Sequence, residues 1–187
     1  MNPPVVIAPP AGQTAPVSDG PDSSEALAVS LHALIVRQPF FKGLNSQQLQ
    51  LLAASALEMK FETGATIFEE GSPANRFFLI LTGRVKLSSE MADRNVIPIQ
   101  TLGPGDDLGW SWLFPPYSMH FSARALTPTT TIFFYGTRLR EQCEQDHELG
   151  YQLMKRIAEV ATQSLQATPR RLIQYIDKNI PEQSFRT

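Results

Sequence analysis

Two segments of the chain carry residues that could do chemistry. The first is a glycine-rich turn, residues 103–109, which leads into the triplet Trp110-Ser111-Trp112. A turn that opens into a short helix exposes several backbone N–H groups, and such a concavity favours an anion, most often a phosphate. The second is the alternating segment 119–125, in which His120 and Arg124 are the polar candidates. Together they predict an anion-type site, although a Gly-Pro-Gly turn alone is a weak signal.

Metal binding and catalysis have less support in the sequence. The three histidines, His32, His120 and His147, are far apart and have no cysteine companions, whereas a metal site needs clustered ligands. Neither a Ser/His/Asp arrangement nor a pair of carboxylates occurs at recognisable spacing. We therefore expect no metal and no enzyme, and an enzyme is the third-ranked alternative. The single Cys143 is read as a half-buried helix residue rather than a redox sensor.

Composition limits the classes of protein further. The chain has 187 residues, 42% of them hydrophobic, and a formal net charge of −2, which suits one domain with a real core. This charge balance does not indicate a global basic stripe that could bind the phosphates of a nucleic acid. No apolar run approaches the ~18 residues of a membrane span, and no secretory signal pattern opens the chain. We expect a cytoplasmic protein that binds neither membrane nor DNA.

Short strands are predicted to dominate from Met59 to Tyr135. Two apolar segments, 66–68 and 77–81, are bracketed by turn signals at 63–64, 71–73 and 82–83. Glycine stands in each of these turns, where a positive φ is expected. The segment Gly136-Thr137-Arg138 closes the strand region.

Helices are predicted on both sides of the strands. The first begins at Ser23 or Ser24 and ends near Pro39, because proline blocks its continuation. The second is capped by Asn45 or Ser46 and has an apolar stripe. The predicted stripe consists of Leu49, Leu51, Leu52, Ala54 and Ala56.

The carboxyl-terminal part is predicted as a long helix from Leu139 to about Ala167, with a break near Asp146-His147. Thr168-Pro169 fits the N-cap and first position of a last helix over 170–178. The proposed organisation is a disordered proline-rich arm over 1–22, a main domain over 23–167, and a short helix with tail over 168–187.

Several separated motifs resemble the cyclic-nucleotide-binding domain of the Crp/Fnr superfamily. They are Pro39-Phe40-Phe41-x-Gly-Leu, the segment Gly64–Gly83 with its Glu70-Gly71, the following Arg84-Val85, and Gly103-x-Gly105-Asp106. The resemblance covers roughly residues 38–165. It implies a mainly β fold with flanking helices: a double-stranded β-helix jelly roll, cupin-like, with N-terminal helices and a long C-terminal helix. It also implies a pocket inside the roll, capped by a phosphate-binding cassette from Gly109 to about Phe121.

The same resemblance shows where this sequence departs from members that bind cyclic AMP or cyclic GMP. Their cassette carries a glutamate for the ribose and an arginine for the cyclic phosphate. Here the glutamate position is Trp110, and the arginine position is Met119 or, with a one-residue shift, His120. A buried phosphodiester without a fixed guanidinium is costly by several kcal/mol. We therefore expect weak or absent binding of cyclic AMP.

The candidate pocket can be read in two ways. It would be lined by residues of the cassette and its flanks, with Arg124 as the nearest cation, and would take a nucleotide-type small ligand. In the other reading Trp110 and Trp112 fill the pocket, and the roll is ligand-free. The predicted lining is Leu108, Gly109, Trp110, Ser111, Met119, His120, Phe121 and Arg124.

The long helix is the other candidate for function. Leu149, Leu153, Ile157 and Val160 form one apolar stripe. In the resembled family a helix at this position pairs two subunits, so the stripe is predicted to mediate a homodimer. A helix lying on its own barrel would bury the same stripe.

These observations predict a stand-alone sensor or regulatory module of the cyclic-nucleotide-binding type. The residues after Gly136 leave too little chain for the DNA-binding domain of the family's transcription factors, so no DNA binding is expected. The alternative function is a ligand-free protein-protein interaction module, whose surface or arm, residues 1–22, binds a protein partner.

Overall fold

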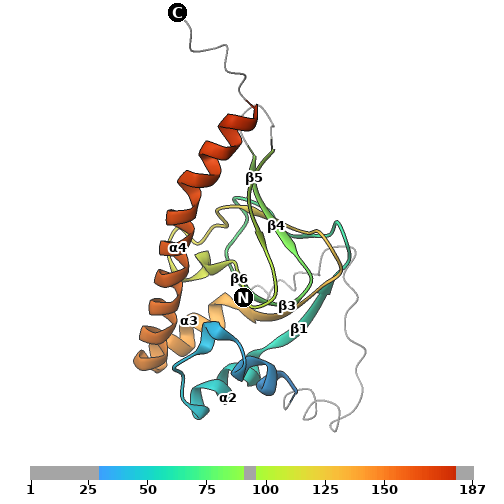
Figure 1. Ribbon diagram of the computed structural model, residues 1–187. Helices are drawn as coiled ribbons and strands as arrows, with labels where there is room; N and C mark the ends of the chain where they lie inside the picture. The colour runs from blue at the N-terminus through green and yellow to red at the C-terminus, as the bar shows by residue number, and fades with distance from the viewer. Residues whose placement is uncertain (1–29, 91–95, 180–187) are drawn as a thin grey trace, which may run out of the picture.

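The structure is a computed structural model that describes residues 30–90 and 96–179, with residues 164–179 described by their backbone alone. A β-roll forms the centre of the molecule, and a long helix runs along one side of it (Figure 1). The predicted arm over 1–22 and the predicted helix start at Ser23 or Ser24 lie outside the described residues. The first described helical residues, 30–36, end before Pro39 as predicted.

The roll consists of two four-stranded antiparallel sheets. The first has the order β1-β8-β3-β6, and the second the order β2-β7-β4-β5. The strands are β1 Leu57–Phe61, β2 Thr66–Phe68, β3 Arg76–Thr82, β4 Val85–Glu90, β5 Val96–Leu102, β6 Asp107–Leu108, β7 Ser122–Ala125 and β8 Thr129–Tyr135. This is the mainly β roll that the sequence predicted, with both predicted apolar segments in place as β2 and β3.

The central strands of the first sheet are buried on both faces. In β3, Phe78 and Ile80 point into the roll, whereas Phe77 and Leu79 pack under the helices. Its neighbour β8 repeats the division, because Phe133 lies opposite Phe78 and Ile132 opposite Leu79. A strand covered on both faces has a continuous apolar sequence in place of alternation. This explains why β3 reads Phe-Phe-Leu-Ile-Leu.

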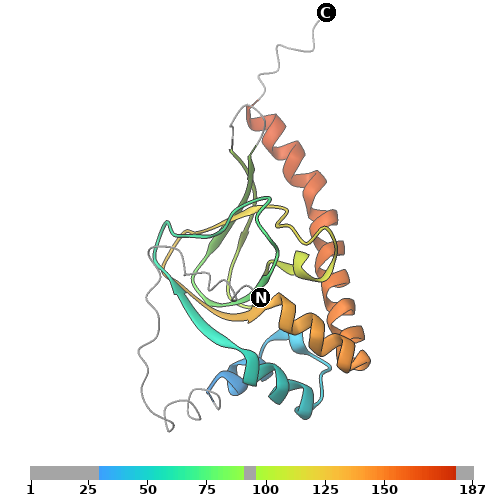
Figure 2. The same cartoon turned by 180° about the vertical axis from the view of Figure 1, so that it is seen from behind.

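The helical layer comprises η1 Pro39–Phe41, α2 Ser46–Ser55, α3 Gly136–Gln145 and α4 His147–Asn179. Figure 2 shows α4 beside the roll, with α2 and α3 at its lower end. A core with Phe41, Phe77 and Trp112 lies between this layer and the first sheet. Removing such large side chains from water is worth about 1.5–3 kcal/mol each, so this core fixes the helices to the sheet.

The second predicted helix begins as expected but faces the core differently. Oδ1 of Asn45 accepts a hydrogen bond from the backbone N–H of Gln48 at 2.9 Å, and Oε1 of Gln48 accepts one from the backbone N–H of Asn45 at 3.1 Å, which completes a capping box. The predicted stripe is partly wrong, because Leu51 and Ala54 are exposed. The buried face consists of Gln48, Leu52 and Ala53. Gln48 is buried because its amide has a partner on Asp146, which composition alone does not reveal.

Asp146 lies at the break between α3 and α4 that the sequence predicted. Its Oδ1 accepts from the N–H of Leu149 at 3.0 Å, and its Oδ2 accepts from Nε2 of Gln48 at 2.9 Å. These bonds to Gln48 and then Leu149 are the main reasons that the pKa of Asp146 is lowered from its ordinary value. One carboxylate thus caps α4 and ties the elbow between the helices to α2.

The separate terminal helix over 170–178 is not observed. Helix α4 is continuous from His147 to Asn179 and passes through Thr168-Pro169 without a break. Proline in a helix interior removes one backbone bond and disfavours the helix by about 3 kcal/mol. Here the residues on both sides of Pro169 are helical, so proline does not mark a helix start. The predicted division at 168 therefore falls inside one helix.

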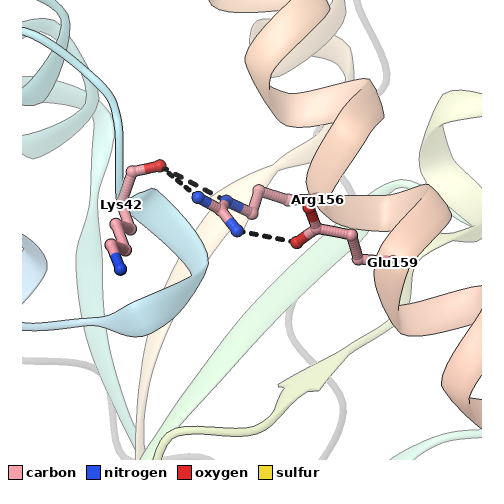
Figure 3. Close-up of polar contacts among 3 residues, drawn as sticks. All are labelled: Lys42, Arg156 and Glu159. Carbon is pink, nitrogen blue, oxygen red and sulfur yellow. Dashed lines mark hydrogen bonds and ion pairs between the residues drawn. The ribbon is translucent and has the colours of Figure 1, made fainter.

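A second polar contact holds α4 against η1. Arg156 donates from Nη2 and Nε to the carbonyl oxygen of Lys42, at 2.8 and 3.3 Å (Figure 3). Its Nη1 pairs with Oε2 of Glu159 at 2.6 Å. The guanidinium therefore joins one turn of α4 to the carboxyl end of the short helix η1. Arg156 and Asp146 therefore attach α4 to the N-terminal helices at two separate points.

The apolar stripe of α4 packs into the core of its own domain. Leu149, Leu153 and Ile157 are fully buried in the core beneath the helical layer, and Val160 is half-buried. The prediction that these residues form a dimer surface is therefore wrong for the three buried ones, because they cannot contact a second subunit without leaving that core. Within residues 147–163 of α4, whose side chains the structure describes, the large exposed apolar side chains are Tyr151 and Met154 instead.

Candidate functional site

The predicted cassette, residues 109–121, begins at a sharp turn after β6. Gly109 has φ 81°, and a Cβ added to it would lie 2.6 Å from the carbonyl oxygen of Arg76 on β3. Both the positive φ and this close approach require glycine. The chain then enters the short helix η2, Trp110–Leu113. Glycine at this point thus turns the cassette outward from the first sheet.

The outer part of the cassette is tied to the loop between β2 and β3. Backbone bonds join Met119 N–H to the Ser72 carbonyl at 2.8 Å and Ala74 N–H to the Tyr117 carbonyl at 2.7 Å. The segment that ends at the first of these anchors is an exposed tip, residues 114–117, which contains a cis Pro115-Pro116 bond. The tip is therefore a fixed surface feature with apolar side chains.

A hollow lies between the cassette and the roll, with space of about 40 Å³ for the centres of water-sized molecules. Since one such molecule needs about 10–15 Å³ on this measure, the enclosed part of the hollow has room for a few waters. Seven of the eight predicted pocket residues line it. The complete lining is Phe68, Leu87, Asp107, Leu108, Gly109, Trp110, Ser111, Met119, His120 and Phe121.

Three lining residues were missed by the sequence analysis. Phe68 and Leu87 come from β2 and β4, and strand alternation could have placed them once the pairing was known. Asp107 was passed over as part of the Gly-Asp-Asp turn. The two aspartates differ, however. Asp106 Oδ2 accepts from Gly103 N–H at 2.8 Å within the turn, while Asp107 belongs to β6.

Asp107 has an unusual environment for a carboxylate. Its Oδ2 is shielded from solvent and has no hydrogen-bond partner in the described part of the chain. Burial raises the pKa of Asp107 to about 7, assisted by the neighbouring Asp106 charge and opposed by a backbone N–H. A buried carboxylate oxygen without a partner is costly, so this group is stabilised by a proton.

The second notable feature of the hollow is the pair formed by His120 and Trp110. His120 Nδ1 lies 2.7 Å from Ser111 Oγ, and the imidazole stacks on the Trp110 ring at a centroid distance of 5.6 Å. The hydroxyl contact occupies Nδ1, which leaves Nε2 as the ring nitrogen available to a ligand. His120 is itself exposed, so the hollow is reachable from solvent on this side.

Arg124 is not part of the hollow, contrary to the prediction. In β7, Ala123 and Ala125 point into the roll, so Arg124 points outward and is exposed. It lies opposite Lys86 on the outer face of the second sheet. The ten lining residues therefore include neither arginine nor lysine.

The two tryptophans also divide in a way that the sequence did not predict. Trp110 lines the hollow, whereas Trp112 is fully buried in the core under the helical layer, against Phe77. Trp112 therefore does not fill the hollow. It anchors the cassette to the helices, since a Cβ on Gly136 at the start of α3 would lie 2.7 Å from Trp112 Cβ.

Arg140 of α3 completes this anchor. Its Nη1 donates to the Trp112 carbonyl oxygen, and its guanidinium lies 4.7 Å from the centre of the Tyr117 ring. One side chain thus holds both the end of η2 and the exposed tip of the cassette. A change in the position of the cassette has to move or break these contacts.

Comparison with known proteins identifies the family. The cyclic nucleotide-binding domain family matches residues 58–146. The crystal structure of a protein from Geobacter metallireducens GS-15 described as cyclic nucleotide-binding is 34% identical with a TM-score of 0.65, over 73% of this chain and 98% of the other. The chain belongs to the cyclic nucleotide-binding domain family. The predicted family and fold are thereby confirmed, and the matched family is one of regulatory domains rather than enzymes.

Two further proteins are similar to this chain. The N-terminal domain of a transcriptional regulator from Streptomyces coelicolor is 26% identical, with a TM-score of 0.58 over 72% of this chain and 93% of that one. A CRP-like cAMP-activated global transcriptional regulator of Mycobacterium tuberculosis is 25% identical over 148 residues, which is 79% of this chain. This chain spans 64% of the length of that curated relative.

Other kinds of site were sought in the same residues. Within 30–90 and 96–179, no three histidine, cysteine or carboxylate side chains gather as metal ligands. No described helix has the length and apolar character needed to cross a bilayer. Cys143 is half-buried where α3 meets α4, and burial raises the pKa of its thiol to about 11. Such a thiol is poorly ionised, as the structural reading of this residue implies.

Proposed function

We propose that this domain is a regulatory sensor in which a small ligand in the hollow sets the position of the cassette relative to α3 and α4. The observation that carries the proposal is the double contact of Arg140 with Trp112 and Tyr117. It joins the segment that borders the hollow to the first helix after the roll. A ligand biases that joint only if it binds two arrangements of the cassette unequally.

We also propose that the domain does not bind cyclic AMP tightly. The lining of the hollow includes neither arginine nor lysine to meet a cyclic phosphate. A phosphate buried there would lose its hydration without gaining an ion pair to a fixed guanidinium. The bulk of Trp110 adds to the penalty at the position of the family's ribose contact.

Homodimerisation is the second part of the proposal, through the outward face of α4. Tyr151 and Met154 are 60% and 50% exposed and lie three residues apart, which places them on one face. Analytical ultracentrifugation of the wild type and of the double variant Tyr151→Glu/Met154→Glu tests this. We expect a dimer that the double variant loses; a monomeric wild type would contradict it. Glu148→Gln, an exposed change on the same helix, is the control.

A protein-interaction module is the alternative function, and the tip of the cassette favours it. Phe114 and Tyr117 are 41% and 43% exposed, and the two prolines between them are exposed as well. A run of four exposed apolar residues is unusual on a surface without a partner. In this alternative the tip, rather than the hollow, binds the regulatory partner.

A ligand screen separates the two functions. Thermal shift would be measured with cyclic AMP, cyclic GMP and cyclic di-GMP. Guanosine belongs in the screen because a remote structural relative from Trypanosoma cruzi, 17% identical, is bound to it. We expect no shift with cyclic AMP at 100 µM, a concentration on the order of 100 Kd for a tight ligand. Micromolar or tighter affinity for cyclic AMP would overturn the second proposal above.

A separate measurement tests whether Arg140 transmits the effect of a ligand from the cassette to α3. For any compound that shifts the melting temperature, hydrogen exchange over 136–146 would be compared with and without ligand in the wild type and in Arg140→Met. We expect Arg140→Met to bind the compound but lose the exchange change in α3. Arg138→Met, an exposed change two residues away, is the matched control. If both variants respond as the wild type does, Arg140 does not transmit the signal.

A further inference from the structure

We propose that the hollow takes an uncharged molecule with one flat aromatic ring, lodged between the apolar wall of the roll and Trp110 of the cassette. The inference rests on the proposed sensor function and names the class of ligand for the same site. It departs from the family resemblance, which implies a phosphate.

The wall that the roll contributes to the hollow is apolar. It is formed by Phe68, Leu87, Leu108 and Met119, which belong to the hydrophobic cluster inside the roll or pack against it. None of these side chains makes a strong hydrogen bond. The surface that a ligand places against this wall leaves water, which is favourable where that surface is apolar.

A charge on the ligand would have no buried partner in the hollow. Two lining residues can ionise, Asp107 and His120, and neither lysine nor arginine is among the lining. On β6 the side chains alternate between faces: Leu108 belongs to the cluster inside the roll, whereas Asp107 lies opposite Leu79 of the helical core. The Asp107 carboxylate therefore does not face the hollow. His120 is exposed, so water would screen any charge on it. An ion of either sign would lose hydration on entry without gaining a buried counter-ion.

The polar side chains around the hollow are already paired. Ser111 is 5% exposed, and its hydroxyl lies 2.7 Å from Nδ1 of His120. Apart from Asp107, no lining residue has a buried side-chain nitrogen or oxygen without a partner among the described residues. A strongly polar ligand would find few groups in the hollow that are free to replace its bonds to water.

The aromatic side chains favour a flat ring over an aliphatic ligand. Trp110 and His120 are stacked at an interplanar angle of 27°, and Phe68 and Phe121 also line the hollow. Contacts between aromatic rings are favourable beyond the apolar area that they bury. A flat ring can make such contacts with both the cassette and the roll.

The size of the hollow links this ligand to the sensor function. Its enclosed part has room for a few waters, and a substituted aromatic ring needs more than that. The ring therefore fits fully only when the cassette moves outward. Such a ligand binds the two arrangements of the cassette unequally, which is the condition for an effect on α3.

The test uses three planar probes of nearly the same shape: neutral benzamide, the anion benzoate and the cation benzamidinium. Binding to the full chain would be measured from the backbone N–H signals of residues 109–121 in proton–nitrogen NMR spectra. The pH would be 8, where histidine side chains are generally uncharged. We expect benzamide to bind with a Kd on the order of 1 mM, as suits a ligand of this size. Both ions should bind at least about 10-fold more weakly.

A pair of variants places the ring in the hollow. Trp110→Ala should weaken benzamide binding by about 3-fold to 10-fold, because it removes an aromatic contact. Phe114→Ala is the matched control, since Phe114 is an aromatic residue of the same cassette that does not line the hollow. It should leave the affinity unchanged.

A second pair tests the charge preference directly. Leu87 is half-buried on β4, and Leu87→Lys would bring a cation to the lining on a long apolar stem. This variant should bind benzoate more tightly than benzamide, because the anion then has a partner. Leu87→Met keeps the wall neutral and should retain the order of the wild type.

The other outcomes have definite meanings. Benzoate or benzamidinium that binds the wild type as tightly as benzamide overturns the inference, whether or not a variant folds well. A loss of binding in Phe114→Ala but not in Trp110→Ala also overturns it. If no probe binds while another compound of the ligand screen shifts the melting temperature, the ligand class is wrong and the sensor function stands. If no compound binds in either experiment, the sensor function fails as well.

Discussion

The two faces of the first sheet are built differently. On the helical side, Trp112 and Phe77 are fully buried in a filled core; some of its polar groups are paired, as Gln48 and Asp146 are, and others, such as Nε1 of Trp112, have no partner among the described residues. On the cassette side, a hollow persists beside the half-buried Trp110, and His120 is exposed. The helical side is filled, while the cassette side keeps open space that solvent reaches.

This difference separates stability from recognition. A filled core is destabilised by almost any truncation, whereas truncation beside a hollow removes fewer contacts and costs less. Variants in the two regions should therefore change stability by different amounts, and neutralising a buried unpaired carboxylate should raise stability. The four predictions below test this, from the largest expected effect to the smallest.

Truncation of the two tryptophans should give very different losses. Trp112→Ala removes a fully buried ring and should lower the free energy of unfolding by about 3–5 kcal/mol. Trp110→Ala, in the lining of the hollow, should lower it by about 1 kcal/mol or less. Urea unfolding monitored by circular dichroism measures both. Similar losses would show that the two faces are equally packed, and Trp112→Phe should recover part of the loss.

Neutralising Asp107 should stabilise the domain in alkaline solution. The folded state holds a proton up to about pH 7 that the unfolded state releases near 3.8, so the free energy of unfolding should fall as pH rises between these values. The fall is at most about 4 kcal/mol, since each pKa unit corresponds to about 1.36 kcal/mol. Asp107→Asn should abolish this fall.

Urea unfolding at pH 5 and pH 8 provides the measurement for Asp107. The wild type should be less stable at pH 8 than at pH 5, and Asp107→Asn should exceed the wild type mainly at pH 8. A variant that is less stable than the wild type at both values would mean that the carboxylate has a partner in solution.

Loss of the Arg156 contact should loosen α4. Arg156→Met keeps the aliphatic stem but removes two hydrogen bonds to the Lys42 carbonyl. We expect a loss of about 1 kcal/mol and faster hydrogen exchange in α4, because a bond to a charged donor is worth about 1.5–3 kcal/mol when shielded and less near the surface. Glu159→Gln breaks only the ion pair and should have an effect under about 0.5 kcal/mol.

The smallest effect is expected on the outer face of the second sheet. Lys86 and Arg124 lie directly opposite each other on β4 and β7, an arrangement of like charges that is mildly unfavourable. Arg124→Gln should raise stability by about 0.2–0.5 kcal/mol at low salt, and the gain should shrink at high salt. Ligand binding should be unchanged; a loss of binding would restore Arg124 to the site.

Much of the architecture could be predicted from the sequence because local rules fix it. Turn glycines bracket β2 and β3, Asn45 caps α2, and the elbow falls at Asp146 where the pattern predicted a break. The separate helix after Pro169 was not observed, because a rule about helix starts describes a preference and proline is also tolerated inside a long helix. Local signals place elements but do not settle every boundary.

The site was predicted less completely, because it depends on which face each strand presents. Trp110 and Trp112 are two residues apart, yet Trp112 is fully buried and Trp110 is only half-buried at the hollow, while Arg124 lies on the opposite face of β7 from Ala123 and Ala125. Asp107 was missed because its importance comes from burial, which the sequence does not display. Leu149, Leu153 and Ile157 were correctly predicted to form an apolar stripe. The same apolar stripe is expected whether the helix packs on its own domain or on a second subunit, so the sequence could not distinguish the two.

The contact between Arg156 and residue 42 has a consequence for how the family could be compared. The guanidinium holds the main-chain carbonyl and not the lysine side chain, as Figure 3 shows. Any amino acid at position 42 supplies the same acceptor, so substitution there would leave the contact intact. Paired substitutions at 42 and 156 would not accumulate, and methods that infer contacts from such pairs would overlook this attachment of the helix.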